Sequence, residues 1–189
     1  MSSRTLLFPG KVIVALVAFA GVAAAQNYKE PAPRFHAKTT AGENFTNESI
    51  KGKVVLLEFW TTWCPYCVDE AAFVDQVAKE FAGKGLITLA INVGESKKTV
   101  KKYLEQHPRS IPIVLMEDTN LAAMYQANVY PIYVLIDRDG NIAGTQRGAA
   151  GERALRRFLT RAGIGGDDDS AARVVPFDAK LHLLLLGHA

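Results

Sequence analysis

The segment "LLEFWTTWCPYCVDE", residues 56–70, contains the only two cysteines of the chain, Cys64 and Cys67. It overlaps an apolar, β-branched run at residues 54–60, which is typical of a strand buried on both faces of a parallel sheet. Helical periodicity begins at the cysteines. The sequence therefore predicts a strand that leads into a helix, with Cys64 at the helix N-terminus.

The position of Cys64 predicts redox chemistry. Free N–H groups and the macrodipole at a helix N-terminus favour an anion, and thiols in such motifs have a pKa of about 3.5 to 7.5. Pro65 suits the first helical position, where its missing N–H costs nothing. We expect an exposed Cys64 to attack a substrate disulfide and a sheltered Cys67 to resolve the mixed disulfide.

Two other interpretations of the cysteine pair are weaker. A zinc site needs a second such pair or two nearby histidines. The four histidines of this chain are instead scattered, at His36, His107, His182 and His188. An inert structural disulfide would gain little, because so short a loop loses little chain entropy on closure. We therefore expect no metal and no cofactor.

Glu58 is a carboxyl group inside an otherwise apolar strand. It shares its alternation with Leu56 and Trp60, so it should face the core. A buried carboxyl is costly unless it is neutral, paired or useful, and desolvation raises its pKa. Such a group could accept the proton of Cys67 during resolution. The alternative is a strand-end residue that faces water.

The rest of the chain alternates between strand and helix patterns. A polar lead-in at residues 27–53 contains one short candidate strand at 44–46. The helix after the cysteines should bury a stripe formed by Val68, Ala71, Ala72, Val77, Ala78 and Phe81. Further strands are predicted at 86–93, 111–116, 132–137 and 141–147, and further helices at 97–107, 120–127 and 151–163. This order predicts an α/β sandwich with helices on both faces and a late antiparallel hairpin at Asp139-Gly140.

Both ends of the chain differ from the middle in composition. Residues 1–25 place Arg4 and Lys11 before an uncharged run that ends in the small residues Ala23 and Ala25. This is typical of a cleaved signal peptide, with an uncleaved membrane anchor as the alternative. We therefore expect a periplasmic or otherwise exported domain at 26–165, followed by a flexible tail at 166–189. A formal net charge of +3 gives no reason to expect nucleic-acid binding.

The motifs "EFWTTWCPYC" and "YPIYVLIDRDG" together resemble the thioredoxin superfamily, and most closely its exported TlpA/ResA-like thiol–disulfide oxidoreductases. The resemblance covers about residues 33–163. It implies a thioredoxin-like three-layer α/β/α sandwich with a mixed central sheet. It also implies that Cys64 is the nucleophile, Cys67 the resolving thiol, Glu58 the buried acid and Pro131 a cis-proline.

Four residues around the cysteines and the proline are expected to contact substrate: Trp63, Pro65, Tyr66 and Tyr130. The chain departs from the thioredoxin pattern in three places. The Pro65-Tyr66 dipeptide between the cysteines resembles that of glutaredoxins, which implies a less reducing potential than that of thioredoxin. Ala90 stands where thioredoxins have a lysine near the buried acid, and Ile132 replaces the usual threonine after the cis-proline.

These observations predict a cell-envelope thiol–disulfide oxidoreductase, a reductant rather than an oxidant, with apocytochrome c as one candidate substrate. Its expected partners are disulfide-bearing proteins and a membrane thiol protein that recycles it, and the protein itself should be monomeric. One alternative is a peroxiredoxin-type peroxidase, because Thr61 lies three residues before Cys64. The other is a copper-binding thiol chaperone, for which His107 and Met124 are the nearest additional ligands by sequence.

Overall fold

The computed structural model describes residues 29–166. The predicted signal peptide at 1–25 lies outside these residues, as does the predicted tail at 166–189 except for its first residue. No helix within the described part of the chain is long and apolar enough to cross a membrane.

A seven-stranded mixed sheet forms the middle layer, in the order β2-β1-β5-β4-β3-β6-β7. The central strand β3 (Val54–Trp60) runs parallel to β4 (Leu86–Asn92) and antiparallel to β6 (Ile132–Ile136). The outer strands are β5 (Ile113–Thr119), β1 (His36–Thr39), β2 (Asn44–Thr46) and β7 (Ile142–Arg147). The late hairpin is confirmed, because β6 and β7 pair antiparallel on either side of Asp139-Gly140.

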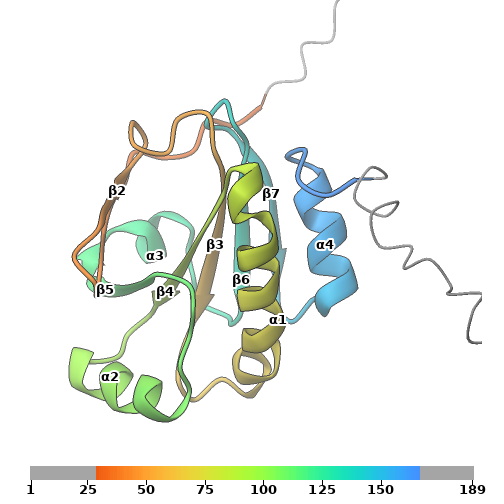
Figure 1. Ribbon diagram of the computed structural model, residues 1–189. Helices are drawn as coiled ribbons and strands as arrows, with labels where there is room; N and C mark the ends of the chain where they lie inside the picture. The colour runs from red at the N-terminus through yellow and green to blue at the C-terminus, as the bar shows by residue number, and fades with distance from the viewer. Residues whose placement is uncertain (1–28, 167–189) are drawn as a thin grey trace, which may run out of the picture.

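Helices cover both faces of the sheet, which confirms the three-layer prediction (Figure 1). On one face α1 (Pro65–Phe81) and α4 (Glu152–Thr160) pack against the sheet, and α2 (Lys97–Gln106) adds Val100 to the same core. Among residues 29–166, the helix on the other face is α3 (Leu121–Met124), which is shorter than the helix predicted at 120–127. A short 3₁₀ turn, η1 (Ala82–Lys84), follows α1.

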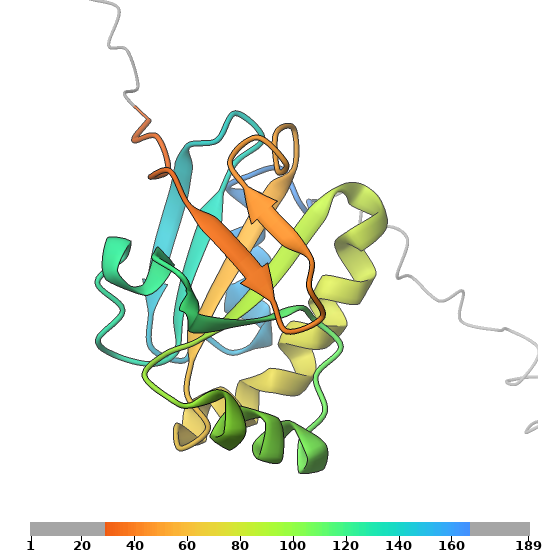
Figure 2. The same ribbon diagram turned by 90° about the vertical axis from the view of Figure 1, so that its left-hand side faces the viewer.

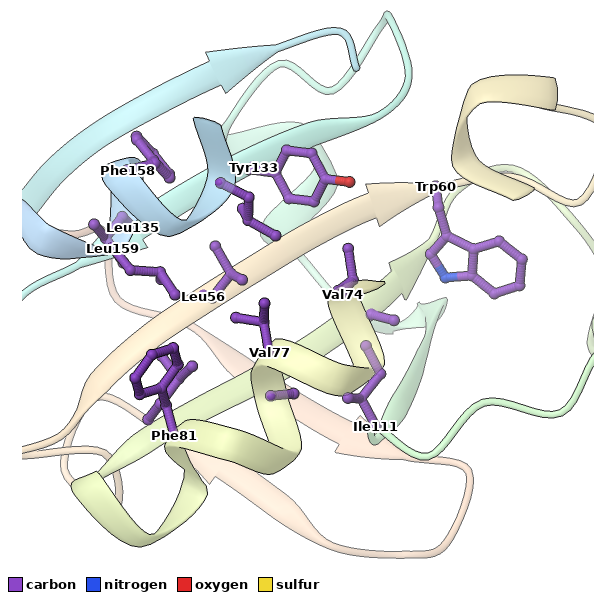
Figure 3. Close-up of a cluster of buried hydrophobic side chains, with 14 of the residues drawn as sticks. Leu56, Trp60, Val74, Val77, Phe81, Ile111, Tyr133, Leu135, Phe158 and Leu159 are labelled. Atoms are coloured by element: carbon purple, nitrogen blue, oxygen red, sulfur yellow. The ribbon is translucent and has the colours of Figure 1, made fainter. Parts of the chain in front are cut away.

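Strand β3 divides the core into two clusters by its alternation. Leu56 and Trp60 face the helices α1 and α4, where Val74 and Phe81 of α1 meet them (Figure 3). The intervening side chains of β3 face α3 and the N-terminal segment, and they are Val55, Leu57 and Phe59. Every residue of β3 is buried, as the sequence predicts.

Strand β2 confirms the candidate strand at 44–46, whereas β1 is the main element that the sequence pattern does not predict. Strand β1 pairs antiparallel with β2 and with β5, and it extends the sheet at one side (Figure 2). Its buried positions are the small residues Ala37 and Thr39, and the exposed ones are His36 and Lys38. So short an alternation, with no large apolar residue, gives no strand signal above a polar loop.

The buried face of α1 also differs from the prediction at its start. The buried residues are Cys67, Glu70, Val74, Val77, Ala78 and Phe81. Val68 and Ala72 are exposed and Ala71 is only half-buried, so the expected stripe is correct only in its second half. Because Cys67 points inward, the buried stripe starts one residue earlier and includes Glu70.

Candidate active site at the start of helix α1

Cys64 caps the N-terminus of α1. Its backbone is extended, with φ −86° and ψ 108°, and Pro65 occupies the first helical turn. Cys64 and Cys67 form a disulfide with their Cα atoms 5.3 Å apart. The backbone N–H of Cys67 donates to the Cys64 sulfur at 3.1 Å. In the reduced protein the same donor would stabilise a Cys64 thiolate, together with the helix dipole.

The prediction of an exposed Cys64 is wrong for this disulfide form. Cys64 is 3% exposed and Cys67 is 2% exposed. The Cys64 sulfur is bonded to the buried Cys67 sulfur and lies against its N–H, so the first turn of α1 covers it. The exposed surface around the pair belongs instead to Trp63 and Tyr66, which are 67% and 63% exposed.

The segment around Pro131 lies beside the cysteine motif. The Tyr130–Pro131 peptide bond is cis, as the resemblance implies. The Tyr130 ring makes an edge-to-face contact with Trp63, with 5.8 Å between ring centroids. The Tyr130 hydroxyl donates to the carbonyl of Ala127 at 3.0 Å, which holds the ring in place. Trp63 and Tyr130 are therefore brought together, as expected of residues that contact one substrate.

Glu95 holds the loop that precedes the cysteines, and the sequence analysis does not identify it. The backbone N–H and the hydroxyl of Thr62 donate to the two Glu95 oxygens at 2.7 and 2.5 Å. The Asn92 amide donates to the same carboxylate at 2.8 Å. Glu95 lies just before α2, which both views place at the same end of the sheet as the start of α1 (Figures 1 and 2).

Glu58 is fully buried on the α1 face of the sheet, which confirms that it faces the core. Its Oε2 accepts a hydrogen bond from Nη2 of Arg109 at 2.9 Å. Its Oε1 has no hydrogen-bond partner among residues 29–166. Burial raises the pKa of Glu58 above its usual value, although the Arg109 guanidinium opposes that shift.

Arg109 also binds a second carboxylate. Its Nε donates to Asp75 of α1 at 2.7 Å, and its guanidinium lies over the Trp60 ring, 5.9 Å from the ring centroid. Ala90 pairs with Glu58 across β3 and β4, so β4 supplies no cation at that point. The cation comes from the loop between α2 and β5 instead, and no local sequence pattern pointed to it.

A cleft of about 170 Å³ opens beside Cys67. Its lining includes Cys67, Val68, Asp75, His107 and Arg109. The half-buried and exposed residues at the start of α1 thus form a wall of this cleft rather than core. The cleft therefore borders Cys67 as well as Arg109 and its partner Asp75.

The two extra copper ligands considered from the sequence lie apart. His107 lines the cleft beside Cys67, with its ring stacked on Tyr103 at 4.2 Å. Met124 belongs to α3 on the opposite face of the sheet. Within residues 29–166 no three histidine, cysteine or acidic side chains form a group that could hold a metal ion.

Glu70 is a second buried carboxylate, one turn after Cys67. It accepts a 2.7 Å hydrogen bond from the Tyr133 hydroxyl and a 2.6 Å bond from the backbone N–H of Gly151. Figure 3 shows the Tyr133 ring among the apolar side chains of the α1 face. The spacing of three residues from Cys67 was the signal that could have identified Glu70 as buried.

Comparison with known proteins agrees with this geometry. Residues 28–145 match the family described as the AhpC/TSA family. The chain belongs to this family. It is 30% identical to the thiol–disulfide oxidoreductase ResA of Bacillus subtilis (strain 168) over 128 residues, which are 68% of this chain and 72% of ResA.

Two further relatives extend the match. The thioredoxin-like protein YneN of Bacillus subtilis (strain 168) is 30% identical over 162 residues, covering 79% of this chain and 94% of YneN. A DsbE-type thiol:disulfide interchange protein from Chlorobium tepidum superposes with a TM-score of 0.64 at 25% identity, covering 71% of this chain and 96% of that structure. The protein is a thiol–disulfide oxidoreductase of the ResA/DsbE type, with Cys64 and Cys67 as its cysteine pair.

Removing the Tyr133 hydroxyl should destabilise the fold. Tyr133→Phe leaves the buried Oε2 of Glu70 without its donor, which should lower the free energy of unfolding by about 1–3 kcal/mol. Tyr125→Phe is the matched control, because the Tyr125 hydroxyl is buried with no partner among the described residues and its loss removes no hydrogen bond. Urea unfolding of both variants measures the difference. Equal stability of the two would show that the Tyr133–Glu70 bond contributes nothing.

Proposed function

We propose that Cys64 is the nucleophile and Cys67 the resolving thiol of a disulfide-reducing cycle. The observation that supports these roles is the N–H of Cys67 directed at the Cys64 sulfur on the first turn of α1. The Cys64 thiolate attacks a substrate disulfide, forms a mixed disulfide and releases one substrate thiol. Cys67 then attacks Cys64, the second substrate thiol leaves, and the Cys64–Cys67 disulfide forms.

The substrate binds across the aromatic side chains that flank the cysteines. Trp63 and Tyr66 present the largest exposed apolar surface at the motif, and Tyr130 contacts Trp63. Large aromatic side chains suit this task, because they give contact area at a low cost in side-chain entropy. Pro65, which is exposed beside Tyr66, completes the contact surface, whereas Pro131 is buried next to Tyr130.

Glu58 acts as the base for the resolution step. It lies on the sheet face that α1 covers, with one carboxylate oxygen unpaired among the described residues. Burial raises its pKa, so it can hold a proton at a pH where an exposed glutamate cannot. It accepts the proton of Cys67 as that thiol attacks the mixed disulfide.

The protein works outside the cytoplasm as a monomeric reductant, and apocytochrome c is one candidate substrate. The composition of residues 1–25 supports export, and the single cysteine pair suits an exchanger rather than a disulfide-stabilised scaffold. A membrane thiol protein supplies the electrons that return the disulfide to the dithiol, because the cell envelope is oxidising.

Cysteine variants test the two thiol roles. Cys67→Ser should accumulate mixed disulfides with substrate proteins, whereas Cys64→Ser should accumulate none, because it lacks the nucleophile. Non-reducing gels and mass spectrometry detect the adducts. A reduction potential near that of thioredoxin, about −270 mV, fits a reductant, and one near −120 mV contradicts this direction. Rapid peroxide consumption by the reduced protein would favour the peroxidase alternative.

Export predicts a new N-terminus. The mature protein should begin at Gln26, because the small residues Ala23 and Ala25 fit the site that signal peptidase recognises. Intact-mass measurement of protein from the cell envelope checks this. An uncleaved chain in the membrane fraction would indicate a tethered enzyme instead.

Glu58→Gln should slow resolution and leave the first attack unchanged. The variant keeps the shape of the side chain but loses the base, so resolution should fall about 10²-fold or more. Single-turnover kinetics with a model disulfide separate the two steps. An unchanged resolution rate would make Glu58 a structural residue.

The pH dependence of stability offers a second measurement on the same variant. The raised pKa of Glu58 means that folding binds a proton there, so parent stability falls relative to the variant as the pH rises above about 4.3. Urea unfolding at several pH values should show this growing difference. A difference that shrinks as the pH rises would contradict the raised pKa.

A further inference from the structure

Two carboxylates share one guanidinium behind the resolving thiol. Arg109 donates from Nη2 to Glu58 and from Nε to Asp75, at 2.9 and 2.7 Å. The Arg109 side chain is only 5% exposed, so water does little to balance its charge. With both carboxylates ionised, the cluster carries a net charge of −1. It can therefore bind one proton and become neutral while Arg109 remains paired.

The geometry decides which carboxylate binds that proton. Both Asp75 oxygens are occupied, one by Arg109 and the other by the backbone N–H of Ser110 at 2.5 Å. The Asp75 side chain is 16% exposed, whereas Glu58 is fully buried with a single partner and a free Oε1. Desolvation and the unused oxygen favour protonation of Glu58, and Asp75 then keeps Arg109 paired.

We propose that Arg109 is a positioning residue that sets the pH at which Cys67 resolves the mixed disulfide. Asp75 is the second carboxylate that Arg109 binds, and it opposes the effect of Arg109 on Glu58. This inference rests on the proposed role of Glu58 as base. Arg109 holds Oε2 and opposes the effect of burial on the pKa of Glu58, which favours the ionised form with Oε1 free to accept the proton. Asp75 limits this effect, because its negative charge offsets part of the attraction between Arg109 and Glu58.

The step balances in atoms and charge. Cys67 loses its thiol proton to Glu58 and its sulfur attacks the Cys64 sulfur. The bond between Cys64 and the substrate sulfur breaks, the Cys64–Cys67 bond forms, and the substrate leaves as a thiolate. The enzyme dithiol is oxidised by two electrons and the substrate disulfide is reduced by two. Glu58 later returns the proton to solvent; its partner Arg109 lines the cleft beside Cys67.

The titratable groups that act on Glu58 come from three neighbouring elements. Asp75 and Glu70 of α1 raise its pKa, and Arg109 of the loop before β5 lowers it. Tyr133 of β6 is paired with Glu58 across the sheet and stays neutral, because burial raises its own pKa strongly. The opposite effects of Asp75 and Arg109 make the proposal testable in two directions.

The experiment follows reduced protein mixed with the aromatic disulfide 5,5′-dithiobis(2-nitrobenzoate) in a stopped-flow instrument. Attack by Cys64 releases one coloured thiol, and resolution by Cys67 releases the second. In Arg109→Gln the pH profile of the second release should move to higher pH, with a loss of about tenfold or more at pH 7. In Asp75→Asn the pH profile of the second release should move to lower pH, because Glu58 is then the only carboxylate of the cluster that is paired with Arg109. The first release should be unchanged in both.

Three further variants separate the possible outcomes. Arg109→Lys keeps the cation and should restore most of the parent profile. Arg138→Gln removes an arginine that donates to the backbone carbonyls of Gly52 and Lys84, and it should shift nothing. In a Glu58→Gln background the Arg109 substitution should have no further effect on resolution.

The failures are distinguishable. If Glu58→Gln removes the pH dependence but Arg109→Gln and Asp75→Asn leave it in place or move it in the same direction, Glu58 is the base and our inference about Arg109 is wrong. If Glu58→Gln itself leaves resolution unchanged, the proposed base is wrong and the inference falls with it. Should Arg109→Gln fail to fold, the shift in Asp75→Asn still decides between the two.

Discussion

Burial of β3 on both faces is the constraint from which the rest of the structure follows. Because no residue of Val54–Trp60 reaches solvent, both faces of the sheet must be covered, by α1 and α4 on one side and by α3 with the N-terminal segment on the other. The same strand delivers the chain to Cys64 at the start of α1. Any polar group on it must find its partner inside the protein.

Glu58 is the charged residue of β3, so this requirement is most costly for it. A buried ion pair is weak evidence for stability, because desolvation of both ions offsets most of their attraction. An apolar residue at this position would pack between α1 and the sheet at no such cost. The pair therefore calls for a functional explanation. Its cation, Arg109, lines the cleft beside Cys67, which links the pair to the cysteine-bearing turn of α1.

The sequence predicted the features that local pattern determines. These include the buried strand, Cys64 as helix cap and the inward direction of Glu58. It did not predict Arg109, which lies 51 residues from Glu58 in the chain, in a loop without periodicity. Because Cys67 points inward, the buried stripe of α1 differs from the predicted one and includes Glu70. The hydrogen-bond partner of Glu70, Tyr133, lies 63 residues away in the chain. The burial of a side chain can be predicted from the pattern of residues a few positions apart. The partner of a buried charge depends on which distant segments the fold brings together.

The three carboxylates around α1 differ in their partners, and this difference is why we propose Glu58 as the base rather than a neighbour. Glu70 accepts hydrogen bonds at both oxygens, from Tyr133 and from a backbone N–H, and Asp75 is likewise occupied at both. A carboxylate whose two oxygens already accept hydrogen bonds has fewer lone pairs left for an incoming proton. Glu58 alone among the three keeps an oxygen without a partner in the described structure, so it can take a proton without rearrangement.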